Sequence, residues 1–84
     1  MTGKQLAILA EGYLAGDVGF WEFMNQAPAK PKNSDALDLI DLIEHQPRLT
    51  DKQGNLTAFG SKYIADIRDL IERLKYVTEA VAER

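Results

Sequence analysis

The alternation of apolar and polar positions is sharpest between Ser34 and His45, in the stretch SDALDLIDLIEH. On a helical wheel of about 100° per residue, its apolar side chains cover about 220° of the circumference and its acids the opposite side. The apolar members are Ala36, Leu37, Leu39, Ile40, Leu42 and Ile43, and the acids are Asp35, Asp38, Asp41 and Glu44. So wide an apolar face predicts a core helix, capped by Ser34 and stopped by Pro47, that the other helices wrap.

Two shorter helices are predicted before this core helix. The first is capped by Thr2 and runs to about Ala15, and the second is capped by Asp17 and runs to about Gln26. The second helix carries Trp21, which either covers the core helix together with its apolar neighbours or serves as a partner-binding anchor, since tryptophan is enriched at binding hot spots. Those neighbours are Phe20, Phe23 and Met24.

Residues 48–57, RLTDKQGNLT, interrupt the helical pattern. Two short, partly β-branched pieces flank a turn-rich centre with the sequence DKQG. The pattern favours a small hairpin over a bare loop.

Residues 57–83 show a heptad pattern that predicts a long C-terminal helix. The main apolar positions of this seam are Tyr63, Ile67, Leu70, Leu74, Val77 and Val81. A helix of that length is about 40 Å long, whereas a compact domain of this size is about 30 Å across. The pattern therefore predicts a homodimer through the second half of the seam, and the alternative is a monomeric bundle in which the N-terminal helices fold back along it.

The segment Leu56-Thr57-x-x-Gly60, after a predicted strand and at the start of a long helix, resembles the end of the wing in winged-helix regulators of the PadR and MarR type. The order of two helices, a third helix, a hairpin and a long helix is also similar. The resemblance implies that helix 34–46 occupies the position of the DNA-recognition helix and that Arg48 and Lys52 contact DNA. That helix exposes four acids and no lysine or arginine. DNA phosphates would repel this face, so direct binding of nucleic acid is not expected.

Length and composition indicate one globular domain, residues 1–84, with 45% apolar and 27% charged residues and a net charge of −3. The chain has no cysteine, which excludes disulfides and thiolate metal sites. The N-terminal apolar run is too weak for a signal peptide, and no run is long enough to span a membrane. We therefore expect a cytoplasmic protein that does not bind membranes.

Enzymatic chemistry is not expected. His45 is the only histidine, no nucleophile has a visible base, and neither glycine-rich phosphate-loop pattern occurs. His45 with Asp41 and Glu44 allows a metal site, but a single imidazole beside two carboxylates is a poor ligand set, and a helix C-terminus explains the histidine more simply. The sequence predicts no catalytic residue, no metal and no cofactor.

The sequence as a whole predicts a mainly α domain with three shorter helices, a short hairpin or loop, and a long C-terminal helix. The favoured function is a non-enzymatic protein-interaction module, a dimeric regulatory adaptor. Its partner surface would use Trp21 and the acids Asp35, Asp38, Asp41 and Glu44. The alternatives are a winged-helix-like DNA-binding transcriptional regulator and an acidic inhibitor that occupies the nucleic-acid-binding site of another protein.

Overall fold

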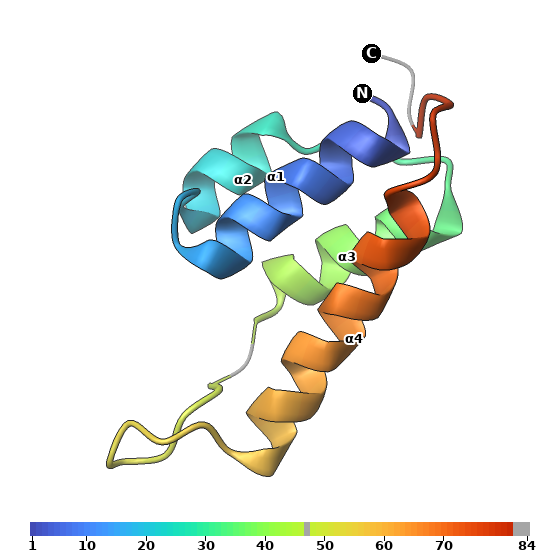
Figure 1. The fold of residues 1–84 in the computed structure, drawn as a ribbon. Coiled ribbons are helices and arrows are strands. Elements are labelled where there is room, and N and C mark those ends of the chain that lie inside the picture. The colour runs from blue at the N-terminus through green and yellow to red at the C-terminus, as the bar shows by residue number, and fades with distance from the viewer. Residues whose placement is uncertain (47, 82–84) are drawn as a thin grey trace.

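Four helices make up most of the described chain, residues 1–46 and 48–81 of the computed structural model (Figure 1). They are α1 (Gly3–Ala15), α2 (Phe20–Gln26), α3 (Ser34–Glu44) and α4 (Ala58–Leu74). These residues contain no strand, and the predicted mainly α fold is confirmed.

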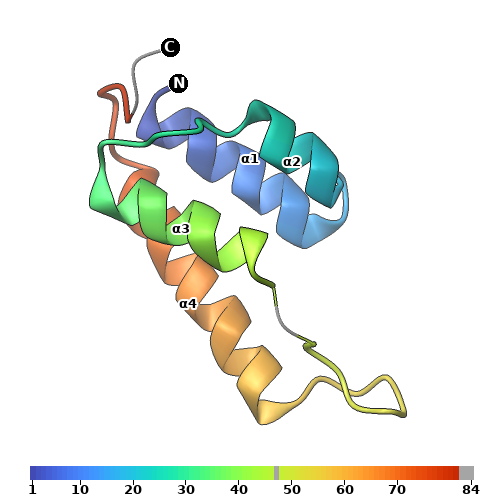
Figure 2. The same ribbon diagram turned by 180° about the vertical axis from the view of Figure 1, so that it is seen from behind.

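The longest helix, α4, is the one along which α1 and α3 both pack (Figures 1 and 2). Near the end of α4, Arg73 lies 3.6 Å from the carboxylate of Asp35 at the start of α3. Near the beginning of α4, the Tyr63 hydroxyl donates a hydrogen bond to the backbone carbonyl of Leu42. These two contacts show that α3 runs antiparallel to α4. The short helix α2 packs against α1 and α3 and contributes the fully buried Phe23.

The hydrophobic core lies between these helices. Its buried members are Leu6, Ala7, Ala10, Phe23, Ala36, Leu39, Ile40, Ile43, Tyr63, Ile67, Leu70, Ile71, Leu74 and Val81. The predicted central arc of α3 is buried as expected. However, Leu37 on the same helix is 51% exposed and Leu42 is only partly buried. The expectation that the other helices cover the whole apolar face of α3 is therefore wrong at the edges of that face, because its main neighbours, α2 and α4, cover only the central arc.

The predicted cap of α1 is confirmed. The Thr2 hydroxyl accepts a hydrogen bond from the Gln5 amide at 3.1 Å, and the Gln5 side chain accepts one from the Thr2 amide at 2.8 Å. This reciprocal pair is a capping box. The predicted start of α2 at Asp17 is wrong, because the helix begins at Phe20 after Gly19, which has no side chain to bond.

The cap of α3 is one residue earlier than predicted. Asn33, not Ser34, is the N-cap, and its side-chain oxygen accepts from the amides of Asp35 at 2.8 Å and Ala36 at 3.1 Å. Asparagine and serine cap equally well, and here the asparagine satisfies two of the free amides of the first turn. The helix ends at Glu44, and its predicted stop, Pro47, lies outside the described residues.

The C-terminal segment differs most from the prediction. Instead of continuing to residue 83, α4 ends at Leu74, and residues 75–81 turn back across the start of α1. The Val77 carbonyl accepts from the Lys4 amide at 2.9 Å, and the Glu79 carbonyl accepts from the Gly3 amide at 3.2 Å. The first amides of a helix have no partner within it. The returning segment satisfies two of them, which a continued α4 could not do.

Val81 anchors this returning segment. Its side chain is 1% exposed, and its amide donates to the Met1 carbonyl at 3.0 Å. Its own carbonyl accepts from the amides of Lys32 and Asn33, just before α3. The end of the described chain thereby ties the start of α1 to the start of α3.

Between α3 and α4 the chain makes a tight turn that projects beyond the helices (Figures 1 and 2). One antiparallel bridge, between Thr50 and Leu56, closes it, so the predicted hairpin consists of a single bridged pair and not of two strands within the described residues. The Asp51 carboxylate accepts from the amides of Gln53 at 2.9 Å and Asn55 at 3.0 Å, which holds the turn closed.

The turn is also fastened to the first turn of α4. Thr57 caps α4 by accepting from the Gly60 amide, while its own amide and hydroxyl both donate to the Leu49 carbonyl, at 3.0 Å and 3.1 Å. A Cβ atom on Gly60 would lie 2.3 Å from that carbonyl oxygen, so only glycine allows the approach. We refer to residues 48–59 as the tip.

Candidate functional site

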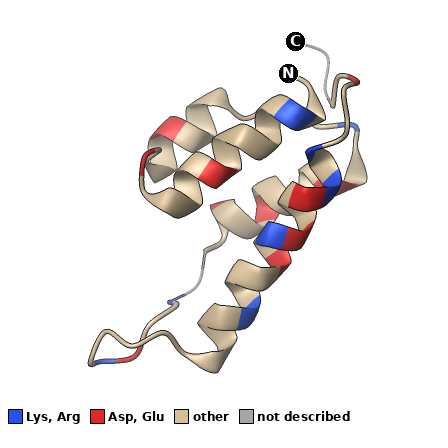
Figure 3. Cartoon of the chain, viewed as in Figure 1, with Lys and Arg blue, Asp and Glu red and all other residues tan. Residues whose placement is uncertain are grey.

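An acidic groove lies where α3 and α4 run side by side, and Figure 3 shows acidic residues gathered there. It is a hollow of about 330 Å³. Its lining residues are Asp38, Asp41 and Leu42 from α3 and Asp66, Asp69 and Leu70 from α4. We call this surface the acidic groove.

The register of α3 on α4 places these carboxylates opposite one another. The hydrogen bond from Tyr63 to Leu42 and the contact between Arg73 and Asp35 fix the two helices at either end of the groove. Burial, and next the nearby Tyr13, raise the pKa of Tyr63 to about 12. The Tyr63 hydroxyl is therefore protonated at neutral pH and remains a donor.

The charges of the groove are only partly compensated. Arg73 pairs with Asp69 at 2.9 Å, and the His45 ring lies 3.1 Å from the Asp41 carboxylate. Asp38 and Asp66 have no ion-pair partner among the described residues. Because all these side chains are exposed to water, solvent screening makes their repulsion tolerable.

The groove only partly matches the predicted partner surface. Asp38 and Asp41 line it, whereas Asp35 pairs with Arg73 at the end of the helix and Glu44 lies outside the lining. Asp66 and Asp69 were not predicted. No local signal in the sequence pairs these two acids with those of α3, because the packing of the two helices decides which of their faces meet.

Trp21, the other predicted element of that surface, is 74% exposed on α2. Its ring meets the Phe20 ring edge-on at 5.1 Å, while Phe23 fills the core in contact with the Tyr13 ring at 5.8 Å. Trp21 therefore does not cover α3, and the interpretation as an anchor for a partner stays a prediction.

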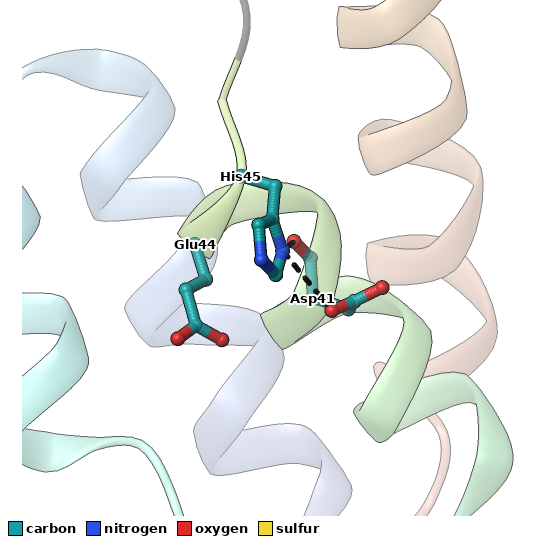
Figure 4. A group of neighbouring side chains, drawn as sticks. All are labelled: Asp41, Glu44 and His45. Carbon is teal, nitrogen blue, oxygen red and sulfur yellow. Dashed lines mark hydrogen bonds and ion pairs between the residues drawn. The ribbon is translucent and has the colours of Figure 1, made fainter.

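The cluster of Asp41, Glu44 and His45 is exposed at the end of α3 (Figure 4). The three side chains offer ligand atoms within 4.8 Å of one another. His45 Nδ1 also lies 3.1 Å from the backbone oxygen of Asp41, and His45 is the C-cap residue. The backbone amide of His45 donates to the same Asp41 carbonyl at 3.0 Å, so His45 caps the end of α3 through its backbone.

The predicted dimer seam is placed inside the single chain. Five of its members are buried there: Tyr63, Ile67, Leu70, Leu74 and Val81. Val77 is partly buried and packs against the core. The premise that one chain cannot cover the seam is therefore wrong, because α4 is shorter than predicted and residues 75–81 fold onto α1.

The tip carries the predicted DNA contacts, Arg48 and Lys52, both exposed. Beside them, Leu56 is 52% and Phe59 61% exposed. Sequence patterning does not indicate this apolar exposure, because both residues adjoin a helix start that could equally have faced the core.

Comparisons with protein-family models, with curated proteins and with solved structures found no match to this chain. The winged-helix resemblance stays a prediction. None of the described helices has the length and apolar character required to cross a lipid bilayer.

Proposed function

We propose that this protein is a small, non-enzymatic interaction module that binds a basic, partly apolar segment of a partner protein in the acidic groove. The observation that carries the proposal is the convergence of Asp38, Asp41, Asp66 and Asp69 from two helices on one hollow. The proposal keeps the regulatory adaptor inferred from the sequence and moves its partner surface from Trp21 and the four acids of α3 to the groove, where Asp66 and Asp69 of α4 join two of those acids. A cytoplasmic location remains part of it.

The chemistry of the groove supports a basic segment with an apolar side chain. The partly buried Leu42 provides apolar surface between the acids, beside the edge of the buried Leu70, so an apolar side chain can lie among lysine or arginine side chains that reach the carboxylates. Exposed ion pairs contribute only about 0.2–1 kcal/mol each. Affinity therefore requires several pairs together with apolar burial, and the charges supply specificity and a fast association rate.

Peptide selection tests the proposal without knowledge of the partner. The immobilised protein is offered a random library of displayed peptides, and selected peptides are then titrated against it by fluorescence anisotropy. We expect enrichment of lysine or arginine next to leucine or phenylalanine, with affinity that falls as salt rises. The doubly neutralised variant Asp38→Asn, Asp66→Asn should lose this selection.

The matched control is Glu11→Gln, Glu22→Gln, which removes the same charge from exposed positions on α1 and α2. The control should select and bind the same peptides as the unmodified protein. Enrichment of neutral or acidic peptides, or equal binding by the groove variant and the control, would contradict the proposal.

A narrower form of the proposal is an acidic inhibitor, in which the basic partner is itself a nucleic-acid-binding protein. The stripe of carboxylates supports this form. In that case, a captured partner should release DNA or RNA when this protein is added, and the groove variant should not cause the release.

The second candidate is a winged-helix-like DNA-binding regulator. The order of three helices, a turn bridged at Thr50 and Leu56, and a longer helix capped by Thr57 favours it. Against it, α3 stands where a recognition helix would lie and exposes Asp38, Asp41 and Glu44. Any DNA contact would have to be made by the tip.

A further inference from the structure

The tip has a surface chemistry opposite to that of the acidic groove. Arg48 and Lys52 are exposed there and form no ion pair within residues 1–46 and 48–81. The only acid of the tip, Asp51, has its carboxylate engaged by two amides of the turn. With two cations against one acid the tip has a net charge of +1, and the exposed Leu56 and Phe59 make it partly apolar.

The tip is held away from the α4 side of the groove of its own chain. The Leu49 carbonyl fastens it to Thr57, at the very start of α4. Asp66 and Asp69 lie nine and twelve residues beyond Thr57, about 13–18 Å further along the helix axis. In both views the turn projects away from the helices (Figures 1 and 2).

We propose that the tip of one copy docks in the acidic groove of a second copy, and that two copies exchange tips around a two-fold axis. Arg48 and Lys52 would meet the carboxylates of the partner copy's groove, while Leu56 and Phe59 would cover its apolar surface. Both surfaces are present in each chain, so the exchange is self-complementary and closes as a dimer. Two exposed apolar side chains next to uncompensated charges become buried in the process.

This inference rests on the proposed function, because it names an occupant of the same groove. A tip in the groove excludes a basic partner segment, so the dimer and the partner-bound protein are alternative states. Dilution, or an acidic molecule that binds the tip in place of the groove, would free the groove. The dimer would thus be a reserve form of the interaction module.

Sedimentation equilibrium of the full chain, from micromolar to millimolar concentration, tests the inference. We expect the mass to rise from 9.4 kDa towards twice that value. The dissociation constant should increase at least about tenfold when salt is raised from low to high ionic strength, because exposed charges are screened. A constant mass of one chain up to millimolar concentration would overturn the inference.

Charge exchange identifies the contact. The tip variant, Arg48→Glu and Lys52→Glu, and the groove variant, Asp38→Lys and Asp66→Lys, should each be monomeric on their own. Mixed together they should form a heterodimer, because the acidic tip then meets a basic groove and the unchanged basic tip meets an unchanged acidic groove. Failure of the mixture to pair, with both variants folded by circular dichroism, would contradict the inference.

Two further variants separate the contact from general charge effects and from loss of folding. Glu11→Lys with Glu22→Lys changes charge by the same amount as the groove variant but should leave dimerisation intact. Phe59→Ser retains every charge and should weaken the dimer at least about tenfold, as loss of a central aromatic contact does. Dimerisation that is insensitive to Phe59→Ser would also overturn the docking proposed here.

Failure of this inference can be distinguished from failure of the proposed function. If the protein stays monomeric yet its groove selects basic peptides, only the self-docking is wrong. If it dimerises through tip and groove but selects no basic peptide even in the tip variant, whose groove is free, the proposed function is wrong and the dimer stands.

Discussion

Replacing Gly3 with alanine should destabilise the protein, although a glycine-to-alanine change within a helix ordinarily stabilises by up to about 1 kcal/mol. Gly3 is the first residue of α1 and is buried beneath the returning C-terminal segment. A Cβ atom there would lie 2.5 Å from Cβ of Val77 and 2.8 Å from its Cγ1. Carbon atoms in favourable contact are about 3.5–4.0 Å apart, so the segment must move by roughly 1 Å or more.

The magnitude follows from what that movement disturbs. The Lys4–Val77 and Gly3–Glu79 backbone hydrogen bonds would be weakened, each worth about 1 kcal/mol. Val81 is 1% exposed in the native structure, and full burial of a valine side chain contributes roughly 1.5–3 kcal/mol. Exposing part of this side chain therefore costs about 1 kcal/mol more. Set against the gain in helix propensity, the net loss is about 2 kcal/mol. In a domain of this size that lowers Tm by about 8–16 °C.

Urea denaturation followed by circular dichroism measures this loss, and hydrogen exchange of the Lys4 and Val81 amides locates it. Gly19→Ala is the control, because nothing lies within 4 Å of a Cβ there and its φ is −74°. Because Gly19 is the N-cap of α2, where alanine is less favourable than glycine, that change should cost no more than about 1 kcal/mol, less than the loss expected at Gly3. If Gly3→Ala is neutral or stabilising, residues 75–81 are not packed against α1 as described.

The remaining predictions concern α4 and the groove. Leu74→Glu should unfold the protein and not merely produce a monomer, because Leu74 is 0% exposed within one chain and an unpaired buried charge costs several kcal/mol. Circular dichroism measures the loss of helix, and sedimentation measures the mass. Asp38→Ala should change the free energy of unfolding by less than about 0.5 kcal/mol in urea titration, and a larger loss would mean that the carboxylate is paired. Burial, followed by Tyr13, raises the pKa of Tyr63 from 10.0 to about 12. The stability that the protonated Tyr63 hydroxyl contributes is therefore complete below pH 10 and is lost as pH rises towards 12. The unfolding of Tyr63→Phe at alkaline pH should lack this loss of stability. Duplex DNA should bind weakly or not at all at physiological salt, and a submicromolar mobility shift that Lys52→Ala abolishes would instead favour the winged-helix regulator.

Local patterning by itself determined most of the helical framework. The 3.6-residue period identified the buried arc of α3 and the inner face of α4. The Thr2 cap was also readable, because a cap requires only a side-chain oxygen and amides within three residues. The sequence did not show that Asn33 and not Ser34 caps α3, because the two residues are adjacent and have equal capping preference. The path of the preceding loop decides which of the two is the cap.

Only the tertiary structure decided where α4 ends and what covers its seam. The heptad pattern continues through Val77 and Val81 in the sequence. An apolar residue at these positions fits a continued helix and a returning segment equally well, so the pattern alone does not distinguish the two. The free amides at the start of α1 favour the returning segment, because the carbonyls of Val77 and Glu79 accept hydrogen bonds from them only when residues 75–81 are not helical.

The acidic groove likewise depends on packing. Asp38 and Asp41 are visible on one helix, but Asp66 and Asp69 join them only because α3 lies antiparallel to α4 in one particular register. Sequence reveals the face of each helix separately, since side-chain period is a local property. Which faces meet is a long-range property, set by the burial of the core as a whole.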